Sequence, residues 1–158
     1  YLSTLNQRET VVLQRLNGSQ PVQVLAPPGS RRAASGTAMG RALLSRLTQA
    51  EFDALYGTDP SSPLPVEGKD CPVTVGELAQ RVAQVRADHY GVAIDQAMPG
   101  IGAVAAAVRD PASGELRGLC LSFVSFQADA ARVAALRESL TQQVAALGRE
   151  LNDPYWLG

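Results

Sequence analysis

Histidine and cysteine are scarce in this chain, and their scarcity limits the chemistry that it can perform. His89 is the single histidine among 158 residues, and Cys71 and Cys120 are the two cysteines. One histidine cannot build a multi-histidine metal site, and no metal or other cofactor is predicted. The cysteines lie far apart and outside any C-x-x-C pattern, which is typical of small, buried, reduced side chains, although a disulfide between them remains open.

Long hydrophobic runs and a large excess of charge of one sign are also missing. No apolar run reaches the roughly 18 residues that a membrane-spanning helix requires, so no contact with a membrane is expected. The formal net charge is −1, and Arg31–Arg32 is the one adjacent basic pair. A segment that grips a nucleic-acid backbone needs clustered Lys and Arg, so this chain by itself is not expected to bind DNA. It starts at Tyr1 without a leader-like stretch, which favours a cytoplasmic domain taken from a longer protein.

The hydrophobic pattern predicts an α+β domain built from antiparallel strands and packed helices. Strands are expected over Tyr1–Leu5, Thr10–Leu16, Pro21–Ala26, Gly91–Asp95, Gly102–Arg109 and Leu116–Val124. A first helix is expected over Ala38–Leu47, and a last one along the apolar seam from Val133 to Leu151. Two more helices are expected to begin at the capping motifs Thr48-x-x-Glu51 and Thr74-x-x-Glu77, and the helix that begins at Thr74 should end near His89. The segment Gly57–Pro72 is dense in Pro, Gly and Ser and is expected to be irregular.

The start of the first predicted helix is the most informative stretch for function. With Thr37 as the N-cap, the main-chain amides of Ala38 and Met39 fall in the first turn, where they have no acceptor within the helix. Free amides at the positive end of the helix dipole form a natural seat for an anion, and the small residues around the turn let a ligand approach the backbone. The alternative is an ordinary capped helix that binds nothing but water.

Several motifs, taken in order, resemble the effector-binding domain of the IclR family of bacterial transcription regulators. The run Gly40-Arg41-Ala42-Leu43-Leu44 is similar to the family's Gly-Lys-x-Leu-Leu and follows a small-residue turn, as it does there. The likeness continues through His89-Tyr90-Gly91, the run from Gly100 to Ala106, Cys120-Leu121-Ser122, which resembles a Ser-x-Ser strand, and the closing amphipathic helix. It spans nearly the whole chain, so residues 1–158 are identified as one effector-binding domain.

The resemblance implies a GAF-like fold, which is a curved antiparallel sheet with flanking helices and a long C-terminal helix. It also implies a winged helix-turn-helix DNA-binding domain upstream, outside this chain, and assembly into a homodimer or homotetramer. The implied ligand is a small organic acid, aromatic acids included, and DNA is bound only through the upstream domain. Carried over residue by residue, the resemblance predicts ligand contacts at Pro21, Val24, Arg32, Ala38, Met39, Asp95, Ala103, Cys120 and Ser122.

The sequence departs from the family pattern at positions that bear on the ligand. Ser35 stands where histidine is usual, and Arg32 stands where a relative can carry an apolar pocket residue. A guanidinium there either pairs bidentately with a carboxylate or is simply a solvated loop arginine. The predicted function is small-molecule sensing without catalysis, in which binding shifts the DNA-binding state of the oligomer. Two alternatives remain open, a GAF-like thiol-based enzyme that uses Cys120 and a pure oligomerisation module.

Overall fold

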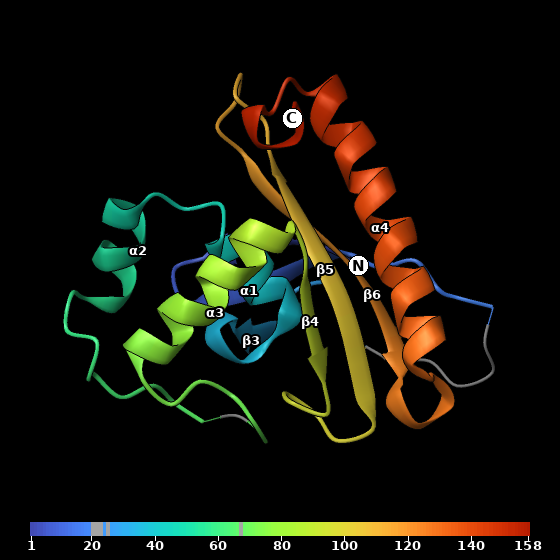
Figure 1. Ribbon diagram of the computed structural model, residues 1–158, viewed down its shortest axis with the longest axis horizontal. Helices are drawn as coiled ribbons and strands as arrows, with labels where there is room; N and C mark the ends of the chain where they lie inside the picture. The colour runs from blue at the N-terminus through green and yellow to red at the C-terminus, as the bar shows by residue number, and fades with distance from the viewer. Residues whose placement is uncertain (20–23, 25, 67) are drawn as a thin grey trace.

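A six-stranded antiparallel sheet organises the chain (Figure 1). The computed structural model describes residues 1–19, 24, 26–66 and 68–158. Within them the strands are β1 (Leu2–Asn6), β2 (Glu9–Gln14), β3 (Arg31–Ala33), β4 (Gly91–Ile94), β5 (Ile101–Arg109) and β6 (Leu116–Val124). They lie in the order β3-β2-β1-β6-β5-β4, and every neighbouring pair is antiparallel. The α+β class predicted from the sequence is confirmed.

The first three α-helices begin at the capping residues that the sequence predicts, whereas the last begins three residues before the predicted Val133, with Asp129 as its N-cap. The helices are α1 (Ala38–Leu44), α2 (Gln49–Tyr56), α3 (Val75–Asp88) and the long α4 (Ala130–Glu150), with short 3₁₀ turns η1 (Ala34–Gly36), η2 (Ser125–Gln127) and η3 (Pro154–Trp156). Thr48 and Glu51 form a complete capping box at α2. At α3 the box is altered, because the Glu77 carboxylate accepts from the amide of Val73 instead of that of Thr74. His89 ends α3 in the left-handed conformation, as expected near that position.

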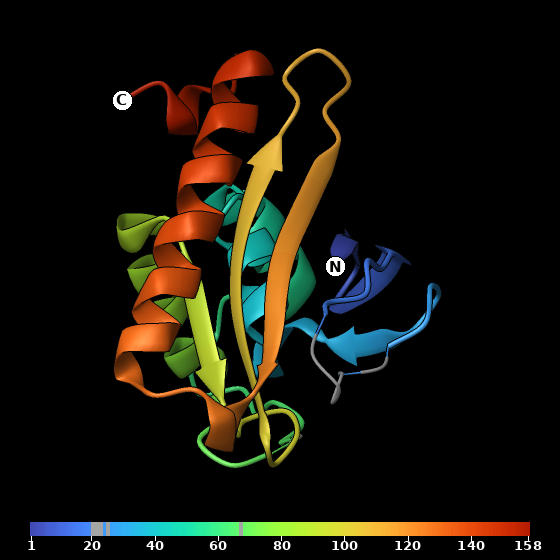
Figure 2. The ribbon, with the colours of Figure 1, turned by 90° about the vertical axis from the view of Figure 1, so that its right-hand side faces the viewer.

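The two faces of the sheet are covered by different helices because the side chains of β5 alternate. Val104, Ala106 and Val108 face α4 and form a cluster with Val144 and Trp156. The intervening residues of β5 face α1 instead. Figure 2 shows α4 along one side of the long strands, while the β1–β2 hairpin and β3 curl away on the other side. The sheet is therefore concave toward α1.

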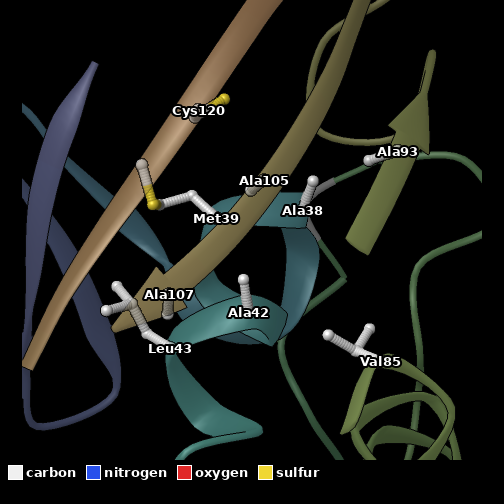
Figure 3. Packing of buried hydrophobic residues seen from close by; sticks show 9 residues of the cluster. All are labelled: Ala38, Met39, Ala42, Leu43, Val85, Ala93, Ala105, Ala107 and Cys120. Carbon is white, nitrogen blue, oxygen red and sulfur yellow. The ribbon is translucent and has the colours of Figure 1, made fainter. Parts of the chain in front are cut away.

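Small residues let α1 lie close against this concave face. Figure 3 shows Ala38 and Ala42 of α1 against Ala105 and Ala107 of β5. On β6, a Cβ added to Gly118 would lie 2.3 Å from the sulfur of Met39. Gly40 is more constrained, since its added Cβ would lie 2.0 Å from the carbonyl oxygen of Ala34. The helix whose first turn is predicted to bind an anion is therefore tightly packed inside the fold.

One predicted boundary is wrong, and one strand was not predicted. The additional strand is β3, which pairs with β2 through Glu9, Thr10 and Val11. The predicted strand Pro21–Ala26 lies largely outside the described residues. The first helix ends at Leu44 instead of Leu47, because the amides of Arg46 and Leu47 bond three residues back in a tightened last turn. The other predicted strands and helices are confirmed to within two residues at most ends.

Candidate functional site

A cavity of about 150 Å³ lies between the start of α1 and the concave face of the sheet, and we call it the α1 cavity. An engineered protein cavity of similar size binds benzene, so the space suits a single ring or a short aliphatic molecule. The lining residues come from all six strands, from the start of α1, and from the β2–β3 and β4–β5 connections. They are Tyr1, Ser3, Thr10, Val12, Val24, Ala26, Arg32, Thr37, Ala38, Met39, Ala93, Gln96, Ala97, Met98, Ile101, Ala103, Cys120 and Ser122.

The α1 cavity brings together seven of the nine residues predicted to contact a ligand. These are Val24, Arg32, Ala38, Met39, Ala103, Cys120 and Ser122. Pro21 lies outside the described residues. Asp95 is not among the lining residues. Arg32 lies on β3 and not in a loop, and its exposed side chain borders the cavity, so it is both solvated and within the lining of the candidate site.

The first turn of α1 has the capping geometry that the sequence predicts. The Thr37 hydroxyl accepts from the amide of Gly40 at 2.9 Å, and the Thr37 carbonyl accepts from the amide of Arg41 at 3.1 Å. These bonds leave the amides of Ala38 and Met39 in the first turn without an acceptor inside the helix. Both residues are buried and border the cavity, so this turn does not face bulk solvent.

Cys120 and Ser122 project from the same face of β6, as their spacing predicts. Their Sγ and Oγ atoms lie 3.6 Å apart. Burial raises the pKa of the Cys120 thiol, which disfavours the thiolate that a nucleophile requires. His89 offers no activation there, because its ring stacks on Tyr155 and Trp156, and Trp156 belongs to the cluster on the opposite face of the sheet.

Asp95 holds the β4–β5 loop in place. Its carboxylate accepts from the amide of Gly100 at 2.7 Å and from the hydroxyl of Ser125 at 2.8 Å. Its backbone is left-handed, with φ of 56°. The loop that Asp95 braces carries Gln96 and Met98, which do line the α1 cavity. Asp95 therefore supports the wall of the cavity from outside.

Sequence reasoning missed four polar residues of the α1 cavity. Ser3 and Thr10 are buried on the β1–β2 hairpin, Tyr1 directly precedes β1, and Gln96 lies on the β4–β5 loop. The alternation along β1 could have placed Ser3 on the same face as the buried side of the hairpin, but short hydroxyl side chains carry no sequence signature of their own. None of the described lining residues is an aspartate or glutamate, so the cavity offers hydroxyls, amides and the Arg32 guanidinium to a ligand.

A second hollow, of about 260 Å³, lies at the far end of β6 near the start of α4. It shares Tyr1, Val24 and Ser122 with the α1 cavity, and Gly18 and Val24 on its wall flank residues 20–23, which are not described. Although this hollow is larger, it holds few of the predicted contacts. The α1 cavity is the better candidate because it gathers most of them around buried polar groups.

Neither a metal-binding cluster nor a membrane-spanning helix is found among the described residues. Outside residues 20–23, 25 and 67, no group of three or more His, Cys, Asp or Glu side chains is arranged to hold a metal ion. Among the helices of the described segments, none has the length and apolarity that crossing a bilayer demands.

The fold and the similarity to known proteins together identify the family to which this chain belongs. A curved antiparallel sheet around a buried helix, with a cavity between the two, is a GAF-like α+β domain. Residues 1–149 match the protein family described as bacterial transcriptional regulator IclR C-terminal. The chain therefore belongs to the IclR family of transcription regulators, as an effector-binding domain, and the family predicted from its motifs is confirmed.

The relatives extend beyond this chain. The HTH-type transcriptional regulator XynR of Escherichia coli K12 is 28% identical over 157 residues, which make up 98% of this chain and 60% of XynR. The crystal structure of the repressor BlcR of Agrobacterium tumefaciens is also 28% identical, with a TM-score of 0.75 over 95% of this chain and 58% of BlcR. The present chain thus spans about 60% of the length of these relatives.

A second similar structure contains a ligand. It is an IclR homologue from Microbacterium hydrocarbonoxydans solved in complex with 4-hydroxybenzoate, and it is 21% identical with a TM-score of 0.70. The match covers 88% of this chain and 56% of that protein. At this level of identity the likeness shows the shared fold.

Proposed function

We propose that this domain senses a small organic carboxylate, which binds in the α1 cavity. The observation that carries the proposal is the lining: hydroxyl, amide and guanidinium donors surround a space of about 150 Å³, with no acidic side chain among the described lining residues. A carboxylate is stabilised by such donors, and more strongly when the donor is charged. The amides of Ala38 and Met39 add two main-chain donors at the positive end of α1.

The ligand of a relative supports an acid of this size. The Microbacterium homologue is a complex with 4-hydroxybenzoate, a one-ring carboxylate. In the α1 cavity, Val24, Ala103 and Met39 provide apolar contacts for such a ring, while Ser122, Cys120 and Arg32 stand where its polar ends can be bound.

The regulatory consequence follows from the thermodynamic linkage between ligand binding and the arrangement of the oligomer. A ligand shifts an equilibrium only by the difference between its affinities for the two states, so binding must favour one arrangement of a homodimer or homotetramer over another. A winged helix-turn-helix domain upstream of this chain would bind DNA and report that shift. A regulator that binds DNA acts in the cytoplasm of a bacterium, and the domain itself performs no catalysis.

A thermal-shift experiment with matched pairs tests the proposal. Each of benzoate, 4-hydroxybenzoate and pyruvate is compared with its neutral amide. We expect the melting temperature to rise with the concentration of at least one acid and less with its amide, because a ligand that binds only the native state stabilises it. A panel in which no acid raises the melting temperature would contradict the proposal and favour the pure oligomerisation module.

Two neighbouring arginines provide a matched pair of variants. Arg32 lines the cavity, whereas Arg31, the preceding residue on β3, pairs with Glu9 at 2.8 Å on the exposed surface. We expect Arg32→Ala to weaken binding of the acid by about two- to fivefold, as for a solvent-exposed ion pair. Arg31→Ala removes the same charge and should leave the affinity unchanged.

A further inference from the structure

Among the described residues, Arg41 is a buried cation whose hydrogen bonds all go to neutral groups. Its guanidinium, 3% exposed as a residue, donates to the carbonyls of Ser35 at 3.3 Å and Val92 at 3.1 Å. Its third bond, at 2.8 Å, goes to the side-chain oxygen Oε1 of Gln96. Within the described segments no carboxylate lies within ion-pair distance of it. A buried charge that lacks a counter-ion is costly, and it raises the positive potential of its surroundings.

The charge persists at neutral pH. Burial, together with the nearby positive charge of Arg81, lowers the pKa of Arg41 to about 10. The side chain therefore remains protonated and can act only as a donor. Its bonds to Ser35 and Val92 also fix the guanidinium in place, since they tie α1 to η1 and to β4.

This fixed donor determines how the Gln96 amide is oriented. A glutamine side chain has an accepting oxygen at one end and a donating NH₂ group at the other. Arg41 binds the oxygen, because the opposite orientation would bring the NH₂ group against another donor. Gln96 lines the α1 cavity, so the donating end is the end left for a ligand. Asp95 braces the loop next to it through Gly100 and Ser125.

We propose that Gln96 selects the charge of the ligand: its NH₂ group donates to the ligand's carboxylate, and Arg41 is the positioning residue that fixes this donor. The inference rests on the proposed function and adds a specificity-determining pair to it. Arg41 does not itself line the cavity, so it can act on the ligand only through Gln96.

Gln96→Glu is the sharpest test because it preserves the shape of the side chain. The new carboxylate would pair with Arg41, cancel its charge and present an acceptor to the ligand in place of a donor. We expect the affinity for the acids of the panel to fall by about ten- to a hundredfold, as when a hydrogen bond to a charged group is lost. The neutral amides, which carry an NH₂ donor of their own, should bind as well as before or better.

Other variants separate the loss of the Gln96 donor from a general loss of folding or of surface charge balance. Gln143→Glu makes the same change of charge on the exposed face of α4 and should leave every affinity unchanged. Gln96→Met removes the donor without adding a charge and should weaken the acids while sparing the amides. Arg41→Lys keeps the charge but loses the geometry, so the ratio of acid to amide affinity should fall even where folding, followed by the unliganded melting temperature, is intact.

The outcomes distinguish this inference from the function on which it rests. If the wild-type domain binds none of the acids by calorimetry, both are overturned. If it binds an acid and Gln96→Glu or a folded Gln96→Met keeps the wild-type ratio of acid to amide affinity, only the role of Gln96 is overturned and the sensing cavity stands. A fall in that ratio confined to the Gln96 and Arg41 variants supports the inference.

Discussion

The guanidinium of Arg46 lies over the ring of Tyr155, with its central carbon 3.7 Å from the ring centroid. The same guanidinium donates to the carboxylate of Asp153 at 2.5 Å, and that carboxylate also accepts from the amide of Arg109 at 2.8 Å. The indole of Trp156 donates to the carbonyl of Ala107. The last turn of the chain is thus fastened to the segment that follows α1 and to β5, and both α1 and β5 contribute to the lining of the α1 cavity.

Asp153→Ala should strongly destabilise the domain. Asp153 is 1% exposed, and its removal leaves Arg46 buried without its partner, a change that typically costs about 3–5 kcal/mol. Urea denaturation measures the loss. Asp88→Ala, at an exposed position on α3, is the control and should change the free energy of unfolding by less than about 0.5 kcal/mol. Equal stabilities of the two variants would contradict the importance of this contact.

Gly40→Ala should destabilise the domain although it replaces glycine within a helix. Helix propensity alone favours alanine by about 1 kcal/mol. The added Cβ, however, would lie 2.0 Å from the backbone oxygen of Ala34, and such overpacking costs about 1–3 kcal/mol or more. Gly118→Ala meets the flexible side chain of Met39, which can move, so it should lower the melting temperature less. A lower melting temperature for Gly118→Ala than for Gly40→Ala would show that the backbone of η1 shifts more easily than the side chain of Met39.

Cys120→Ser should leave ligand-induced stabilisation intact, because the serine hydroxyl can still bind a polar end of the ligand and the proposed function requires no thiol chemistry. In a Cys71→Ser background, Cys120 is the only thiol, and its labelling by iodoacetamide can be followed by mass spectrometry. Because burial raises its pKa, labelling should be slow at neutral pH and should accelerate only at a higher pH than for a free cysteine. Rapid labelling at neutral pH, or a turnover lost in Cys120→Ser, would favour the thiol-based enzyme instead.

Asp95→Ala should loosen the β4–β5 loop and thereby weaken ligand binding without removing a lining side chain. The variant loses the bonds to Gly100 and Ser125, and we expect it to lower the free energy of unfolding by about 2 kcal/mol beyond its control. Asp70→Ala is that control, because Asp70 is exposed and has the same left-handed backbone, with φ of 57° against 56° for Asp95. Amide exchange at Gly100 should accelerate in Asp95→Ala only. Unchanged exchange there would mean that the loop does not depend on this carboxylate.

Most of the regular elements could be predicted because their patterns are local. The alternation along β5 and β6 and the apolar seam of α4 are determined by the neighbouring sequence. β3 could not be predicted in this way, since Arg31 and Arg32 are exposed and carry no apolar alternation. It is a strand only because its backbone finds β2 as a hydrogen-bonding partner.

The residues of the candidate site likewise fall into those that the local sequence predicts and those that it does not. Thr37 could be recognised as a cap, and Cys120 and Ser122 could be placed on one face, because both inferences depend on residues close together in the chain. The bond between Arg41 and Gln96 joins residues 55 positions apart, and the presence of Ser3 and Thr10 on the cavity wall depends on how the hairpin curls around α1. No local pattern encodes such contacts.

By itself, the sequence determined the class of this domain, its family and the start of the helix at its centre, because periodicity, capping and motif order are properties of short stretches. The tertiary structure alone decided which polar groups meet around the cavity, and it assigned Asp95 to the loop and Gln96 to the cavity wall. The physical reason is that an enclosed space is formed by the packing of distant segments, and the orientation of a side chain within it is fixed by partners that only folding brings near.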